Sequence, residues 1–148
     1  MKKKSAHNVF RIIAIILLLL VAINALLAGY SFIMEPSGSG LGMTTDYLKP
    51  TAPFKDYFVP GIVLFSVNGV LSAVVAIASI RRKAFYQYLI AMQGCILVGW
   101  IAVQLMMVKS IHPLHFIIGS AGILLIVIGI MLVGKDNALH KNEGLYQN

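Results

Sequence analysis

Six polar side chains in or at the start of long apolar segments of this chain could bind a ligand by hydrogen bonds. They are Asn24, Asn68, Gln93, Trp100, Gln104 and His115. Gln93, Trp100 and Gln104 are spaced by seven and four residues, which places them on one face of a helix. No ionisable residue lies deep in these segments, where proton relays and ion pumps carry such residues. The pattern therefore favours one cavity for a neutral ligand over ion or proton transfer.

The depth of these side chains follows from the rise of about 1.5 Å per residue along a helix. Asn24 and Asn68 lie about 3 Å, and Trp100 about 5 Å, beyond the midpoints of their segments, toward the same side. Gln104, at about 11 Å, and His115 lie further out. We therefore expect a polar layer in the outer half of the molecule that forms the floor of a small pocket. A neutral amphipathic molecule, such as a lipid or a quinone-like ring, would suit this pocket.

A purely structural interpretation of the same residues stays open. Asn, Gln and Ser side chains in membrane helices commonly bond to neighbouring helices, at about 0.6 kcal/mol each. Trp100 would then satisfy its N–H on a neighbouring helix. Gly119, Gly122 and Gly129 would allow close contact between helices.

The segment of about 27 residues after the first apolar stretch, 33–59, is long enough to cover the pocket. Pro53 suits the first position of a short helix. In such a helix Phe54, Tyr57 and Phe58 would share one apolar face directed at the membrane or at the other helices. We therefore predict a short interfacial helix here whose aromatic face is a candidate lid. An aromatic anchor at the headgroup level is the alternative.

Metal, redox and catalytic chemistry find little support in the sequence. The single cysteine, Cys95, excludes a disulfide framework, a Cys-x-x-Cys site and a cysteine-based zinc site. The soft ligands that suit copper occur on one side of the chain, but without a tight Met-x-x-Met or His-x-His pattern. They are Met34, Met43, Met106, Met107, His112 and His115. We expect no catalytic residue, no metal site and no cofactor.

Four apolar segments must position these side chains: residues 12–32, 60–80, 85–108 and 114–133. Each has about 20 or more residues, the length that a helix needs to cross about 30 Å of hydrocarbon. The composition agrees, with 59% hydrophobic and 11% charged residues and a mean hydropathy of +0.86. It excludes a soluble enzyme, a disordered chain and a nucleic-acid-binding domain. We predict an all-α fold, an integral membrane four-helix bundle in one domain, 1–148.

The basic residues indicate an orientation. Nine of the 12 lysines and arginines lie before the first segment, between the second and third, or after the fourth. The positive-inside rule then places both termini in the cytoplasm (N-in, C-in), with 134–148 as a loose cytoplasmic tail. A basic start before an apolar run is also typical of a signal peptide. The run is longer than such peptides use, so we expect it to be retained in a bacterial cytoplasmic membrane.

Several short motifs carry a resemblance to known proteins. They are Glu35-Pro36-Ser37-Gly38, the stretch from Ala52 to Gly61, Asn68-Gly69, Gln93-Gly94, Gly99-Trp100, Gln104 and Leu114-His115. In these motifs the chain resembles a group of small, uncharacterised bacterial four-helix integral membrane proteins over about residues 26–129. Ala52 departs from the serine that the pattern carries. The four-helix layout is loosely similar to that of DoxX-like proteins. The resemblance implies the fold and brings no activity with it.

Three functions compete on these observations. The favoured one is a non-enzymatic accessory or structural membrane subunit, either a homo-oligomer associating through its glycine faces or a member of a larger membrane complex. The second is a binder or carrier of a hydrophobic small molecule, lipid or quinone-like, in the outer-half pocket. The third, a membrane enzyme or redox partner that uses a bound quinone, is least favoured because buried ionisable groups and a cysteine pair are lacking. The bilayer is an expected partner and nucleic acid is not.

Overall fold

The computed structural model describes the backbone of residues 2–111 and 113–145 and the side chains of residues 6–111 and 113–134. Three long helices are α1 (Lys2–Met34), α4 (Tyr86–Met107) and α5 (Pro113–Leu145). Between α1 and α4 lie three shorter helical segments, α2 (Phe58–Val63), η3 (Leu64–Val70) and α3 (Leu71–Ile80). The segments α2, η3 and α3 follow one another without a break, and η3 is π-helical. Together they form one rod, the second span. Within the described residues the only extended pairing is an isolated bridge between Leu48 and Val108.

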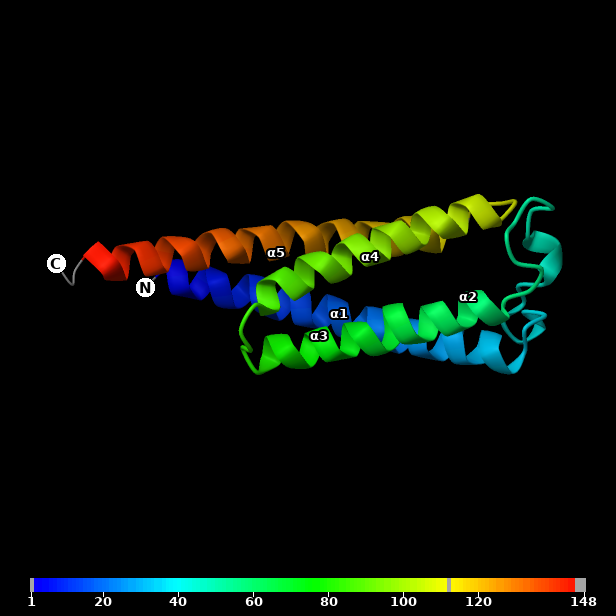
Figure 1. The fold of residues 1–148 in the computed structure, drawn as a ribbon, viewed down its shortest axis with the longest axis horizontal. Helices are drawn as coiled ribbons and strands as arrows, with labels where there is room; N and C mark the ends of the chain where they lie inside the picture. Colours follow the sequence, from blue (N-terminus) through cyan, green and yellow to red (C-terminus); the bar gives the residue numbers. More distant parts are fainter. Residues whose placement is uncertain (1, 112, 146–148) are drawn as a thin grey trace.

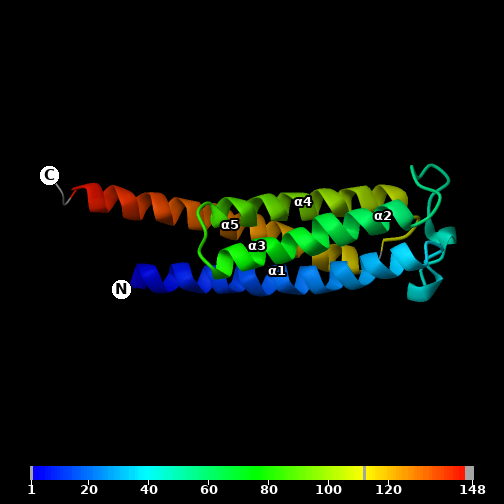
Figure 2. The same ribbon diagram turned by 60° about the horizontal axis from the view of Figure 1, so that its bottom comes forward.

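The predicted all-α four-helix bundle is confirmed. The helices run side by side in Figures 1 and 2, with residues 35–57 covering one end of the bundle and both chain ends at the other. We refer to these as the loop end and the terminal end. The loop end is the side on which the predicted polar layer and pocket were expected, called the outer half above. The helices pack on one another along their length.

Helix ends differ from the prediction mainly at the terminal end. The helix α1 begins at Lys2 rather than near residue 12. The helix α5 continues to Leu145, well past the predicted end near 133 (Figure 1). The stretch predicted as a loose tail is therefore helical through Leu145, as its Ala, Leu, Lys and Glu residues favour. Residues 146–148 of that tail lie outside the described residues.

The four rods pack as two pairs. The helix α1 lies along the whole second span, and α4 lies along α5. The pairs meet through contacts of α1 with α5 and of α3 with α4. A fully buried apolar core runs through the bundle and includes Leu18, Ile90, Leu97, Leu125 and Leu132.

Glycines set the distance between the helices of each pair. A Cβ atom on Gly29 would lie 2.6 Å from a backbone nitrogen of η3. A Cβ on Gly94 would lie 2.6 Å from the carbonyl oxygen of Gly122, and one on Gly129 would lie 2.7 Å from the backbone nitrogen of Ala91. Gly122 and Gly129 of α5 therefore face α4 of the same chain. These two of the three glycines expected to allow close helix contact therefore already pack on a neighbouring helix within the chain.

The loop end contains short helices, but not at the predicted place. Two 3-10 turns occur, η1 (Ser39–Leu41) and η2 (Thr45–Tyr47). The interfacial helix predicted over 53–58 does not form, because residues 52–57 contain bends and no helical turn, and Phe58 is the first residue of α2. The Tyr57 N–H donates to the carbonyl of Pro36, 2.9 Å away across the loop. The Asp56 carboxylate accepts from the Phe58 N–H at 3.0 Å, which starts α2 instead of continuing an earlier helix.

Candidate functional site

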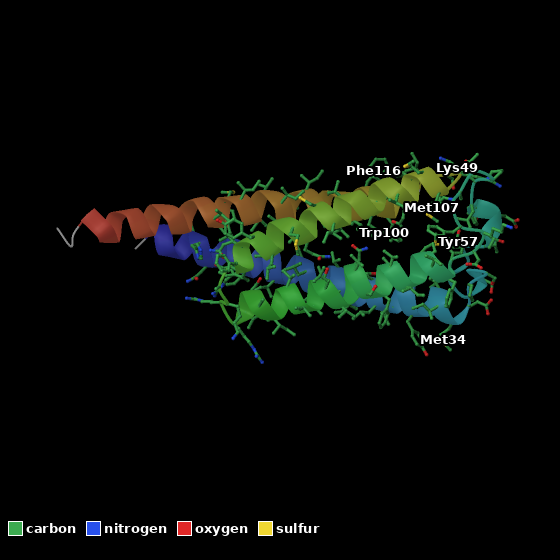
Figure 3. All side chains as sticks on the ribbon, viewed as in Figure 1. Met34, Lys49, Tyr57, Trp100, Met107 and Phe116 are labelled. Carbon is green, nitrogen blue, oxygen red and sulfur yellow. The ribbon has the colours of Figure 1, made fainter. Side chains whose placement is uncertain are left out.

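A small pocket lies at the loop end, between the outer loop and the ends of the helices. Figure 3 shows Tyr57, Trp100 and Met107 together in this region. The cavity is about 30 Å³, room for one or two water molecules. Its lining comprises Phe32, Met43, Leu48, Tyr57, Pro60, Leu64, Trp100, Gln104, Met107, Val108 and His115. A lipid or a quinone-like ring would enter only after the loop moves.

Tyr57 is the central residue of the loop over this pocket. Its side chain is 4% exposed and its ring stacks on Phe32, with the ring centroids 4.7 Å apart. Its hydroxyl donates a long hydrogen bond of 3.4 Å to the carbonyl of Thr44. Burial, and then the nearby Tyr47, raise the pKa of the Tyr57 phenol above its usual value. The phenol therefore stays neutral and keeps its donated hydrogen bond at physiological pH.

The other two predicted lid residues lie differently. Phe54 is partly buried and packs on the apolar cluster at the loop end, which includes Phe32, Leu48 and Met107. Phe58 is the first residue of α2, is 42% exposed and is not among the residues that line the pocket. The prediction of one shared aromatic face for the three residues is therefore wrong.

Two lysines hold the loop to the far helix pair. The Lys49 N–H donates to the Met107 carbonyl at 2.7 Å, and the Lys49 Nζ reaches the Leu105 carbonyl at 3.1 Å. A cation at the C-terminus of α4 also interacts favourably with the helix dipole. The Lys109 N–H and Nζ donate to the carbonyls of Tyr47 and Asp46 at 2.8 and 2.7 Å. Sequence analysis assigned neither lysine to the site.

Of the predicted cavity residues, three line this pocket. Trp100 and Gln104 approach it from α4 and His115 from α5. The Trp100 Nε1 atom is buried and has no hydrogen-bond partner within the described part of the chain. A buried indole N–H without a partner would be satisfied by an acceptor oxygen brought within its reach.

Asn68 and Gln93 lie deeper, at the centre of the bundle. Both side chains are fully buried. The Gln93 Nε2 donates to the Val67 carbonyl at 3.2 Å, which joins α4 to the π-helical segment of the second span. Neither residue lines the pocket at the loop end. The six residues expected in one cavity are thus divided between two sites and the surface.

Asn24 is the residue at the surface. Its side chain is exposed on α1, and its Nδ2 bonds only to the carbonyl of Leu20 in its own helix, at 3.2 Å. The expected meeting with Asn68 and Trp100 does not occur, because the buried face of α1 carries Ala22, Ala25 and Phe32 instead.

The structure brings only some of the soft ligands together. Met43, Met107 and His115 line the pocket, whereas Met34 and Met106 are 65% and 73% exposed. His112 lies outside the described residues. Among the described residues no group of three or more His, Cys, Asp or Glu side chains could hold a metal ion.

The fold and its surface define the class of the molecule. Ala6–Met34, Phe58–Ile80, Tyr86–Met107 and Pro113–Gly134 are each long and apolar enough to cross a membrane, and only 28–33% of the most apolar stretch of each is buried inside the bundle. The chain is a multi-pass membrane protein. No family model, no curated protein and no solved structure matches it. Its function must therefore be argued from its own residues.

Proposed function

We propose that this chain is a non-enzymatic membrane subunit that associates with a second copy of itself through the exposed side of α1. The observation that carries the proposal is Asn24. This amide lies on the exposed side of an apolar helix, between Ile23 and Leu27, which are 56% and 66% exposed. Such a surface faces hydrocarbon, where an unpaired polar group is costly.

The amide of Asn24 retains unused hydrogen-bonding capacity. One N–H reaches the Leu20 carbonyl, and the Oδ1 atom has no partner among the described residues. A side-chain amide both donates and accepts, so two copies of Asn24 related by a two-fold axis can satisfy each other. Asparagine in membrane helices associates helices in this way.

The exposed side of α1 suits contact with a second copy better than the glycine faces do. The close-approach glycines of α4 and α5 are already used between those two helices. The side of α1 opposite its buried alanines carries no such internal contact. The proposal also places the protein in a bacterial cytoplasmic membrane with both termini inside, supported by the basic residues at the terminal end, including Arg11, Arg81 and Arg82.

Native mass spectrometry from lipid nanodiscs tests this proposal. We expect the 16.1 kDa chain to appear as a dimer and Asn24→Leu to shift it toward monomer. Two amide hydrogen bonds at about 0.6–1 kcal/mol each correspond to a roughly tenfold weaker association. Ile23→Leu is the matched control on the same surface and leaves the dimer intact. A monomeric wild-type chain, or a dimer unchanged by Asn24→Leu, would overturn the proposal.

A second candidate function is the binding of a neutral amphipathic molecule in the pocket at the loop end. The unpaired Trp100 Nε1 at this pocket favours it. The lining is mainly apolar, with Gln104 and His115 as further polar groups. Because the cavity is only about 30 Å³, binding requires the loop held by Lys49 and Lys109 to open.

The same mass spectra test this second candidate. We expect the wild-type chain to retain a small-molecule mass that Trp100→Phe combined with Gln104→Leu reduces at least tenfold, since both polar contacts are lost. Asn24→Leu, far from the pocket, keeps the mass and serves as the control. A wild-type chain without any retained mass would contradict ligand binding and leave self-association untouched.

A further inference from the structure

We propose that the centre of the bundle binds a small neutral guest that both donates and accepts hydrogen bonds, of which water is the smallest. The site is the central polar cluster, defined as Asn68, Ser72 and Gln93. All three side chains are 0% exposed. The site is separate from the pocket at the loop end and does not depend on either proposed function.

The three side chains of the central polar cluster are neighbours. Asn68 and Ser72 are four residues apart in the second span and so lie on the same side of it. Gln93 faces them from α4, because its Nε2 bonds to the carbonyl of Val67, next to Asn68. The cluster therefore lies where two helices of different pairs meet.

Four polar atoms of the cluster have no hydrogen-bond partner anywhere in the described residues. They are the Asn68 Nδ2, the Asn68 Oδ1, the Ser72 Oγ and the Gln93 Oε1. They combine donors with acceptors. Buried polar groups are paired in stable proteins, and in hydrocarbon no bulk solvent can pair them. A guest with two donors and two acceptors, as water has, matches this set.

Ser72 shows that the arrangement is particular to this place. Four other serines of the spans donate to a carbonyl four residues earlier: Ser31, Ser66, Ser79 and Ser120. Ser79 is as buried as Ser72, and its Oγ bonds to the Val75 carbonyl at 2.8 Å. Ser72 lies two residues after the end of the π-helical segment Leu64–Val70, and its hydroxyl does not make this bond. Such π-helical segments are rare and occur frequently at functional sites.

The guest is neutral because the cluster is neutral. Its groups are two amides and one hydroxyl, and Gln93 lies between the buried Ile90 and Leu97 on the same face of α4. A charged guest would lose its hydration without an opposite charge to replace it. The polar atoms can hold water or another small molecule such as an alcohol or an amide.

A pair of serine substitutions tests the inference by the sign of the effect. If a guest binds the Ser72 hydroxyl, Ser72→Ala removes one of its bonds and lowers the melting temperature by about 3–6 °C. If the hydroxyl is bare, the same change removes a buried unpaired group and raises the melting temperature. Ser79→Ala is the matched control: it removes a hydroxyl already bonded within its own helix and is expected to shift the temperature by less.

Solid-state NMR in phosphatidylethanolamine/phosphatidylglycerol bilayers tells the sources of the guest apart. Rapid transfer of magnetisation from water to the side-chain amide of Gln93, lost in Asn68→Leu, identifies bound water. No water transfer, together with a retained mass in native spectra that Asn68→Leu removes, identifies another small molecule. A higher melting temperature for Ser72→Ala, with neither signal, overturns the inference.

Discussion

Gly94→Ala is expected to lower the melting temperature of the bundle more than any other single methyl group added to α4. The new Cβ would lie 2.6 Å from the carbonyl oxygen of Gly122 and 2.8 Å from the backbone nitrogen of Ile126. These atoms belong to the backbone and cannot turn aside as a flexible side chain could. The helices α4 and α5 must then separate, and the contacts along the whole pair weaken.

The expected cost of this substitution is about 3 kcal/mol, the upper part of the usual range for overpacking. For a chain of this size that corresponds to a fall of roughly 10 °C in the melting temperature. Thermal unfolding of the purified protein in nanodiscs measures it. Gly99→Ala is the matched control on the same helix, because a Cβ there meets no atom within 4 Å.

The control should be neutral or stabilising by up to about 1 kcal/mol, since alanine favours a helix over glycine. Equal melting temperatures for the two variants would contradict the close contact of α4 with α5. The two positions are five residues apart in the same apolar helix, so their difference isolates packing from helix propensity.

The spans could be predicted from the sequence because their physical cause is local. About 20 consecutive apolar residues cross a bilayer only as a helix, whichever helices surround them. The distinction between lipid-facing and buried sides is not local in this sense. The spans are apolar all round, so hydrophobic periodicity gives little information about rotation.

Asn24 and Gln93 illustrate this limit. The helical rise gives the position of each residue along its own helix. Gln93 is buried and Asn24 is exposed because different sides of α4 and α1 contact other helices. Which helices pack against each other cannot be read from the sequence of either helix alone. The small residues Ala22 and Ala25 on α1 were a usable signal, since they mark the side on which another helix approaches closely.

Lys49 and Lys109 were the missed residues of the loop end. Both belong to the minority of basic residues on the side that the positive-inside rule leaves poor in charge. The positive-inside rule does not account for a lysine on that side. Such a lysine therefore indicates a local structural role more strongly than a lysine in a basic cluster does. Here each lysine binds carbonyl groups across the loop end.

Replacing Gln93 by leucine is expected to disturb the centre of the bundle more than any other polar substitution. The Val67 carbonyl, inside the π-helical segment, would lose the amide that bonds to it at 3.2 Å. An unpaired carbonyl in this apolar interior costs about 1–3 kcal/mol, a fall of roughly 5–10 °C in the melting temperature. Leucine has a similar volume, so the effect comes from the lost hydrogen bond rather than from a cavity.

Hydrogen exchange at residues 64–71 distinguishes this local cause from general loosening. Loss of the Gln93 amide weakens the π-helical turn, and reversion of this turn to an α-helix would rotate Asn68 and the residues after it by about 100° relative to α2. Such a rotation is opposed by packing on both sides, so we expect faster exchange in Leu64–Val70 than in α3. Gln104→Leu, on the same helix but without a side-chain hydrogen bond in the described structure, is the control and leaves this exchange unchanged. If Gln93→Leu has the same melting temperature and hydrogen exchange as the wild-type chain, the π-helical turn is maintained by its own sequence. Gln93 would then bond to the turn without stabilising it.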